Sequence, residues 1–390
     1  MSQLHLTEYK AITLPREAMP YLIGEELDRR YGQYVDVTFP SPRTNGRWQL
    51  MALGWVGHLP LSDGWQLTIH TKVPTKNLWE LLTWAYDWHS WRLFDGDIQS
   101  ETLEAFYDGL ARILAEQILL LARRGLFGRY EPQINRLPVV RGRLQLSPML
   151  KNPVQVEPIC AYEQYTIDNI YNQILALTLH HIGRSGWCQP DTLRLIHRAR
   201  QAVPIQSPSH HIDWSILTYT RLNEPYRRLH VLCKFFLDGL LPHLNYGLSD
   251  AVPFLINMSR LYEQFVAAWL TARLPTTYRL RAQERVTVDE KNGRQIAIDI
   301  VIYNRLGQAT AVLDTKYKAP DHPDMADIYQ VAFYAHQQDC AHAYLVYPAD
   351  LPQSIIGRNR DVTYRNITFA LDGDIEVNGR KFLEQVLADG

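Results

Sequence analysis

Cysteine is scarce in this chain. The 390 residues contain four cysteines, Cys160, Cys188, Cys233 and Cys340. They lie far apart and form no CxxC pair, so the sequence offers neither a disulfide framework nor a cysteine zinc site. This usage is typical of proteins in a reducing compartment, and we expect a cytoplasmic location.

An excess of charge and long apolar runs are also missing. Lys and Arg total 40 and Asp and Glu total 41, which gives a formal net charge of −1. Such a chain has no global attraction to nucleic acid, so any DNA contact must use local basic patches. The stretch 110–121 is interrupted by Arg112, Glu116 and Gln117. We therefore expect no signal peptide, no transmembrane helix and no membrane partner.

Two common catalytic motifs are absent. Without GxxxxGK[ST] the chain has no phosphate-binding loop, and we do not expect it to be a nucleotide-driven motor. Without GxSxG the simplest serine-hydrolase interpretation is removed. The paired histidines at 180–181 and 210–211 are weak metal candidates, because adjacent histidines face different directions and lack a carboxylate or cysteine at suitable spacing.

Two acidic residues interrupt apolar runs in the last third of the chain. Asp299 lies within the run 296–302, and Asp314 follows the run 311–313. Each run is typical of a buried strand. Burying an unpaired carboxylate is costly, so two of them on neighbouring strands indicate that a cation is present in the working state.

The segment 304–307, Asn-Arg-Leu-Gly, supplies a turn between these runs. The sequence therefore predicts a hairpin that brings Asp299 and Asp314 together, with Lys316 on the same face as Asp314. Two carboxylates and one ammonium suit Mg²⁺-dependent phosphodiester hydrolysis, in which the carboxylates hold the metal and the lysine positions or activates the water. This is the D…(D/E)xK signature of restriction-endonuclease-like nucleases. Alternatively, the aspartates only form buried ion pairs with Lys316 or Arg281.

Helices on both sides of the hairpin add two candidate residues for the active site. Helical periodicity over 258–270 offers Glu263, and a second helix from Asp327 offers Gln330. Nucleases with this signature often carry an acidic residue on their first helix and a glutamine near the metal. We expect Glu263 to be an outer or second metal contact and Gln330 to steady the water or the phosphate.

Three regions are predicted, and the fold class is α+β multidomain. Residues 1–76 form a small β-rich module, 77–248 a mainly helical region, and 249–390 a restriction-endonuclease-like α/β domain. A proline-dotted, β-prone stretch at 130–165 predicts a protruding finger within the helical region. Middle-region helices are expected at 77–90, 101–124, 166–183, 189–202 and 222–241. In the first module, Arg43, Arg47 and the aromatics are candidates for contact with nucleic acid or protein, but tryptophans that fill a small core are the favoured explanation.

Six short motifs occur in order along the chain. They are NLWELLTWAY (77–86), ARRGL (122–126), VRGRL (140–144), TIDNIYN (166–172), CKF (233–235) and DTKYK (314–318). In these motifs and in their order the chain resembles the McrC family, the nuclease subunit of McrBC modification-dependent restriction systems. The chain differs from that family at Ile298, where the family usually has a proline, and the resemblance says less about residues 1–76.

The resemblance implies an Mg²⁺-dependent endonuclease that acts with an McrB-like AAA+ GTPase ring on double-stranded DNA containing modified cytosine. In that family the middle region engages the ring and stimulates its GTPase. Arg123, Arg124, Arg141 and Arg143 are therefore the candidates for partner contact; alternatively, they are solvated or bind local carbonyls. Two other functions stay open, a catalytically silent adaptor that only activates the ring and a free-standing nuclease for RNA or branched DNA.

Overall fold

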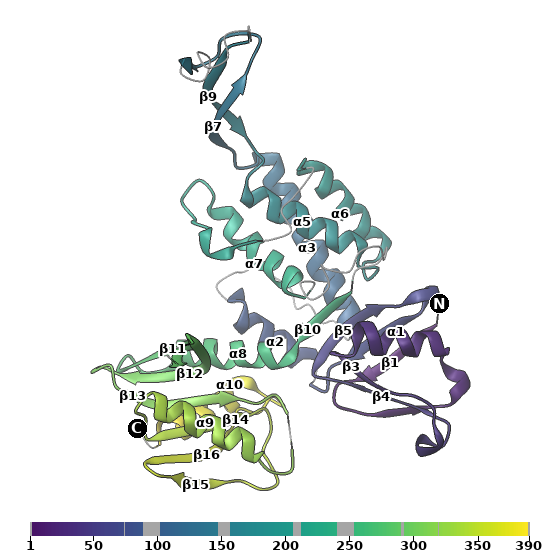
Figure 1. Ribbon diagram of the computed structural model, residues 1–390, viewed down its shortest axis with the longest axis vertical. Helices are drawn as coiled ribbons and strands as arrows, with labels where there is room; N and C mark the ends of the chain where they lie inside the picture. The colour runs from purple at the N-terminus through teal and green to yellow at the C-terminus, as the bar shows by residue number, and fades with distance from the viewer. Residues whose placement is uncertain are drawn as a thin grey trace. The chain divides into compact units, whose positions relative to one another are not determined.

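The protein combines helices with four sheets in its described part, which confirms the α+β class (Figure 1). It divides into two compact units, unit 1 with Met1–Leu103 and Pro253–Gly390, and unit 2 with Glu104–Val252. The computed structural model describes residues 2–73, 75–88, 102–146, 157–205, 212–239, 253–289, 292–318 and 320–388.

The N-terminal module, residues 2–73, holds two sheets around one apolar core. Trp48 is 1% exposed at its centre, so this tryptophan fills a core, the explanation favoured from the sequence. A helix that the sequence did not predict, α1, packs on this core through Leu27 and Tyr31. The elements are β1 (Gln3–Thr7), β2 (Ile12–Leu14), α1 (Tyr21–Tyr31), β3 (Val35–Thr38), β4 (Trp48–Ala52), β5 (Trp55–Pro60) and β6 (Gln66–His70).

One strand of the module comes from the other end of unit 1. Strand β10 (Phe254–Asn257) pairs with β5 and completes the sheet order β1-β6-β5-β10. Gly57 permits this pairing, because a Cβ atom there would meet the carbonyl oxygen of Phe254 at 2.1 Å. Helix α8 (Met258–Arg273) starts directly after β10, and Asn257 caps it by accepting a hydrogen bond from the backbone of Arg260. The predicted first and third regions are thus joined within unit 1.

The C-terminal part of unit 1 is built on a mixed six-stranded sheet in the order β11-β12-β13-β14-β16-β15. Strand β14 is parallel to β13 and β16, and the other pairs are antiparallel. Helix α9 (Met325–Gln337) packs on the sheet through Ile328 and Val331, and α10 (Ile375–Leu387) stacks Phe382 on Phe369. The strands are β11 (Tyr278–Asp289), β12 (Arg294–Asn304), β13 (Ala309–Thr315), β14 (His342–Tyr347), β15 (Ile356–Asn359) and β16 (Val362–Thr368).

Helix α2 (Thr75–Ala85) also belongs to unit 1, although the sequence placed it in the middle region. It packs against α8, and the Asn77 amide donates hydrogen bonds to the carbonyl oxygens of Leu371 and Gly373. The boundary predicted at residue 76 therefore differs from the boundary of the compact units.

In its described residues, unit 2 has four helices close to their predicted positions and a three-stranded sheet, β7-β9-β8. Figure 1 shows β7 and β9 running away from α5 and α6, as the predicted finger should. Residues 147–156 of this stretch lie outside the described residues. No helix in the described ranges combines the length and apolarity needed to span a membrane. The elements are α3 (Leu103–Arg124), β7 (Arg129–Arg136), β8 (Arg143–Leu144), β9 (Ile159–Thr166), α5 (Ile170–Arg184), α6 (Pro190–Ala202) and α7 (Glu224–Asp238).

Candidate active site

The predicted hairpin is formed by β12 and β13. Its turn is held by Asn304, whose side-chain oxygen accepts hydrogen bonds from the backbone of Leu306 and Gln308. Ile300 lies opposite Leu313, so Asp299 and Asp314 follow next in the register, where β13 approaches its end. The period of two and the turn in the sequence thus place both carboxylates at one end of the hairpin.

Asp299 is oriented by Thr315. The Asp299 Oδ2 atom accepts hydrogen bonds from the Thr315 backbone nitrogen at 2.8 Å and from the Thr315 hydroxyl at 2.9 Å. Burial raises the pKa of Asp299, while these two bonds and the nearby Lys316 act in the opposite direction. The side chain is thereby fixed from the neighbouring strand.

Asp314 is 3% exposed and pairs with Lys316, whose Nζ atom lies 2.8 Å from Asp314 Oδ2. Burial, and then the negative charge of Asp299, raise the pKa of Asp314 to about 7. Burial lowers the pKa of Lys316, but the carboxylates of Asp314 and Asp327 outweigh it and raise the pKa above its usual value. Lys316 is therefore held as an ammonium ion. Of the two alternative ion pairs, the pair with Lys316 is present, and Arg281 pairs with Glu284 instead.

Glu263 lies near the aspartates, on α8. Burial, and then the charge of Asp299, raise the pKa of Glu263 to about 7. Its Oε1 atom accepts a hydrogen bond from the amide of Gln283. Gln283 lies between Ala282 and Glu284, which pair with Ile300 and Ile298, so it is across from Asp299; its φ of 50° is in the left-handed region. Strain of this kind in a non-glycine residue is a marker of functional sites.

Gln330 lies on α9 and accepts a hydrogen bond from Lys316 Nζ at 3.2 Å, while its own amide donates to the Tyr334 hydroxyl at 2.7 Å. Asp327, one turn earlier, was predicted only as the start of a helix. Its carboxylate lies 3.4 Å from Lys316 Nζ and 2.5 Å from Lys318 Nζ. The structure thus gathers Asp299, Asp314, Lys316 and Gln330 and adds Asp327.

Over the described residues, no three His, Cys, Asp or Glu side chains stand close enough together to hold a metal ion. Asp299, Asp314 and Glu263 are therefore not gathered into such a cluster, and the Glu263 carboxylate instead accepts the hydrogen bond from Gln283. His180 and His181 contact each other with ring centroids 5.6 Å apart, and residues 210–211 lie outside the described residues.

The four predicted partner arginines fall in two places of unit 2. Arg123 and Arg124 are exposed in the last turn of α3. Arg141 and Arg143 are exposed on the finger, where the Arg141 guanidinium lies 4.4 Å from the centre of the Tyr162 ring. The structure thus presents them as two separate pairs.

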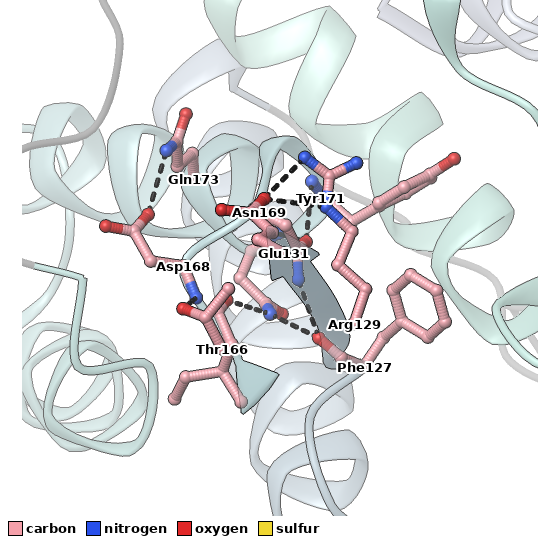
Figure 2. A network of polar contacts seen from close by, with 10 residues as sticks. Phe127, Arg129, Glu131, Thr166, Asp168, Asn169, Tyr171 and Gln173 are labelled. Atoms are coloured by element: carbon pink, nitrogen blue, oxygen red, sulfur yellow. Dashed lines mark hydrogen bonds and ion pairs between the residues drawn. The ribbon is translucent and has the colours of Figure 1, made fainter. Parts of the chain in front are cut away.

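The root of the finger is fixed by a polar network (Figure 2). The Phe127 carbonyl oxygen accepts hydrogen bonds from the amides of Asn169 and Asn172, each at 2.8 Å. Asn169 also caps α5, and the Tyr226 hydroxyl donates to Asn172 at 2.6 Å. The segments that lead into and out of the finger are thus both hydrogen-bonded to the start of α5. Both asparagines belong to TIDNIYN (166–172), which in the sequence indicated only the family resemblance.

Known proteins similar to this chain point to one family. The chain is 22% identical over 267 residues to the Type IV methyl-directed restriction enzyme EcoKMcrBC of Escherichia coli (strain K12), across 63% of this chain and 73% of that protein. A chain from the solved assembly of Thermococcus gammatolerans McrB AAA+ hexamers with bound McrC has a TM-score of 0.56 at 17% identity, covering 99% of this chain and 100% of that one. This second likeness shows the fold alone.

The family model described as McrBC 5-methylcytosine restriction system component matches residues 50–348, well over half of the chain. The match includes the β12–β13 hairpin, the finger and α9. The resemblance seen in the sequence is therefore confirmed, and the chain belongs to the McrBC 5-methylcytosine restriction system component family.

Proposed function

We propose that this chain is the Mg²⁺-dependent DNA endonuclease subunit of a GTP-dependent, modification-dependent restriction complex. One observation carries the proposal: Asp299 and Asp314 stand side by side in the register of β12 and β13, next to the ammonium of Lys316. This is the arrangement that the D…(D/E)xK signature requires of a restriction-endonuclease-like domain. Membership of a restriction-system family supports it.

The carboxylates fit a hard divalent cation. Burial, and then the negative charge of Asp299, raise the pKa values of both Asp314 and Glu263 to about 7. Mg²⁺ prefers carboxylate oxygens, and its positive charge would offset both the burial of these carboxylates and the repulsion between them. Asp299 and Asp314 would hold the ion, with Glu263 as an outer contact. When bound, Mg²⁺ polarises the phosphate and makes a water molecule more acidic.

The remaining side chains have electrostatic and positioning roles. Because Lys316 stays protonated, it orients the attacking water and offsets the negative charge that develops on the phosphate, rather than removing a proton. Gln330 fixes the Lys316 ammonium and is itself fixed by Tyr334. Gln330 would steady the water or the phosphate from this position.

The partner we propose is an McrB-like AAA+ GTPase ring, and the substrate is double-stranded DNA with modified cytosine, in the cytoplasm. The similar structure contains McrB AAA+ hexamers with bound McrC. The finger supports this proposal, because it presents exposed arginines together with exposed apolar residues, among them Tyr130 on β7 and Val139 in the turn after β7, which are 67% and 73% exposed. Exposed apolar residues of this kind mark protein interaction sites.

The test separates cleavage from partner activation. Asp299→Ala and Asp314→Ala should each abolish DNA cleavage in the presence of the GTPase ring, GTP and Mg²⁺, because loss of a metal ligand costs orders of magnitude in rate. Stimulation of GTP hydrolysis should stay intact, since the finger is untouched. Asp350→Ala, at an exposed position, is the matched control.

Undiminished cutting by either variant contradicts the proposal. A wild-type chain that stimulates the ring but never cuts would instead be a silent adaptor, and one that cuts without the ring would be a free-standing nuclease.

A further inference from the structure

A buried carboxylate of the N-terminal module contacts the segment that carries Lys316. Glu8 follows the end of β1 and is 2% exposed. Its Oε1 atom accepts a hydrogen bond from the Tyr317 hydroxyl at 2.7 Å, from the Lys72 backbone nitrogen at 3.0 Å and from the Thr71 hydroxyl at 3.3 Å. One oxygen of the module therefore holds the residue next to Lys316.

Tyr317 is enclosed by groups from several elements. It is 3% exposed, its ring centroid lies 5.9 Å from that of Tyr262 on α8, and Lys72 Nζ lies 4.4 Å from its ring centre. Burial, and then the charge of Glu8, raise the pKa of the Tyr317 hydroxyl far above its usual value, so it remains a hydrogen-bond donor. The ring and the hydroxyl are both fixed in place.

The backbone of the segment 316–318 is held by two further hydrogen bonds. Strand β13 ends at Thr315, and the Lys316 backbone nitrogen then donates to the Val346 carbonyl oxygen at 2.8 Å. The Lys318 nitrogen donates back to the Lys316 carbonyl oxygen at 2.8 Å, which closes a tight turn around Tyr317. The ammonium groups of Lys316 and Lys318 both reach Asp327. Anchoring Tyr317 therefore helps to fix the backbone from which both lysines reach Asp327.

The two oxygens of the Glu8 carboxylate have different surroundings. Taking a carboxylate out of water is unfavourable, and Glu8 Oε2 is buried with no hydrogen-bond donor among the residues that the structure describes. The next residue, Tyr9, has a φ of 57°, a left-handed conformation that is strained for a tyrosine. The three hydrogen bonds to Oε1, one of them from Tyr317, hold this carboxylate in the interior.

We propose that the N-terminal module contributes to the active site, where Glu8 is a positioning residue that helps to fix Lys316 through the hydroxyl of Tyr317. This rests on the proposed nuclease function, in which Lys316 orients water. It assigns to the first residues of the chain a role that their sequence did not reveal. Neither Glu8 nor Tyr317 would touch DNA or metal.

The kinetic test uses the full chain with the GTPase ring, DNA, GTP and Mg²⁺. Glu8→Ala and Tyr317→Phe should each lower kcat for cleavage about 10- to 100-fold, the effect of a small misplacement of a reacting group. The Mg²⁺ concentration for half-maximal rate and the GTPase stimulation should not change. The double variant should be no slower than the slower single variant, because both substitutions remove the same Glu8–Tyr317 hydrogen bond.

Two further variants distinguish positioning from general stability. Glu8→Gln keeps an acceptor for the Tyr317 hydroxyl and should recover most of the rate. Glu17→Ala, at an exposed position of the same module, is the matched control and should leave the rate unchanged. Circular dichroism establishes that each variant is folded. If Glu8→Ala does not fold, the rates of Tyr317→Phe and Glu8→Gln decide whether the proposal stands. A folded Glu8→Ala or Tyr317→Phe chain with the wild-type rate overturns the proposal, and so do effects that simply add.

A second measurement needs no nuclease activity. Trypsin cuts after lysine, and mass spectrometry follows cleavage after Lys316 and Lys318 under native conditions. Loss of the Glu8–Tyr317 bond should speed these cuts several-fold relative to wild type and to Glu17→Ala. If the wild-type complex fails to cut DNA, the proposed function falls, but this measurement still decides the coupling. Unchanged tryptic rates in Glu8→Ala and Tyr317→Phe overturn it.

Discussion

Replacing Asp314 by Asn should stabilise the metal-free protein while removing a predicted metal ligand. Burial, and then the charge of Asp299, raise the pKa of Asp314 from 3.8 to about 7. At about 1.4 kcal/mol for each pKa unit, keeping this carboxylate ionised in the folded chain at pH 8 costs about 4 kcal/mol relative to the unfolded chain. Asparagine keeps the shape without the charge, so the variant avoids this cost.

The sign of the pH dependence follows from the raised pKa. Between about pH 4 and pH 7 the folded chain holds the Asp314 proton more tightly than the unfolded chain does. Metal-free wild type should therefore lose stability as the pH rises through this window, and the variant should lose less. The advantage of Asp314→Asn is largest at pH 8 and disappears toward pH 4.

Differential scanning fluorimetry in EDTA measures the effect. One kcal/mol shifts Tm by about 2–4 °C in a unit of this size, so the variant should melt about 10 °C above wild type at pH 8. Mg²⁺ at about 100 times its Kd should raise the free energy of unfolding of the wild type by about 2.7 kcal/mol and leave that of the variant unchanged. The difference in Tm between the two proteins should therefore become smaller. Asp350→Asn, at an exposed position, controls for the substitution. A variant that melts at or below the wild-type temperature at pH 8 in EDTA refutes the reasoning.

Two predictions concern unit 2. Replacing Arg141 and Arg143 together by Ala should lower stimulated GTP hydrolysis about ten-fold or more, as expected for arginines that join a nucleotide site; a phosphate-release titration that superimposes on wild type would leave Arg123 and Arg124 as the next pair. Asn172→Ala should lower the free energy of unfolding by about 1–3 kcal/mol, because it removes a hydrogen-bond partner of the Phe127 carbonyl oxygen and of the Tyr226 hydroxyl. An unchanged Tm together with unchanged GTPase stimulation would show that the network in Figure 2 does not support the finger.

The hairpin and its flanking helices are predictable because their signals are local. Apolar runs with period two, an Asn-to-Gly turn and helical periodicity around Glu263 and Gln330 all act within a few residues of one another. Helix α1 was missed because its signals are weak. It contains Gly24, and no side chain caps its start after Pro20.

The rest of the site depends on contacts that no local pattern encodes. Gln283 meets Glu263 and faces Asp299 only because β11 pairs with β12 in one particular register, and a shift by one residue would turn its side chain to the other face. Glu8 and Tyr317 are 309 positions apart in the chain. The pairing of β10 with β5, which joins both ends of unit 1, is non-local in the same way.

The most direct test of the central claim, that Asp299 and Asp314 bind the catalytic metal, is to map the metal on the chain. Fe²⁺ can replace Mg²⁺ at hard oxygen ligands, and with ascorbate and peroxide it cleaves the nearby backbone. Mass spectrometry of wild type should find cuts near residues 299 and 314 and at the start of α8. These cuts should be lost in Asp314→Asn and kept in Asp350→Asn. Cuts confined to other parts of the chain, or an unchanged pattern in Asp314→Asn, would contradict the claim.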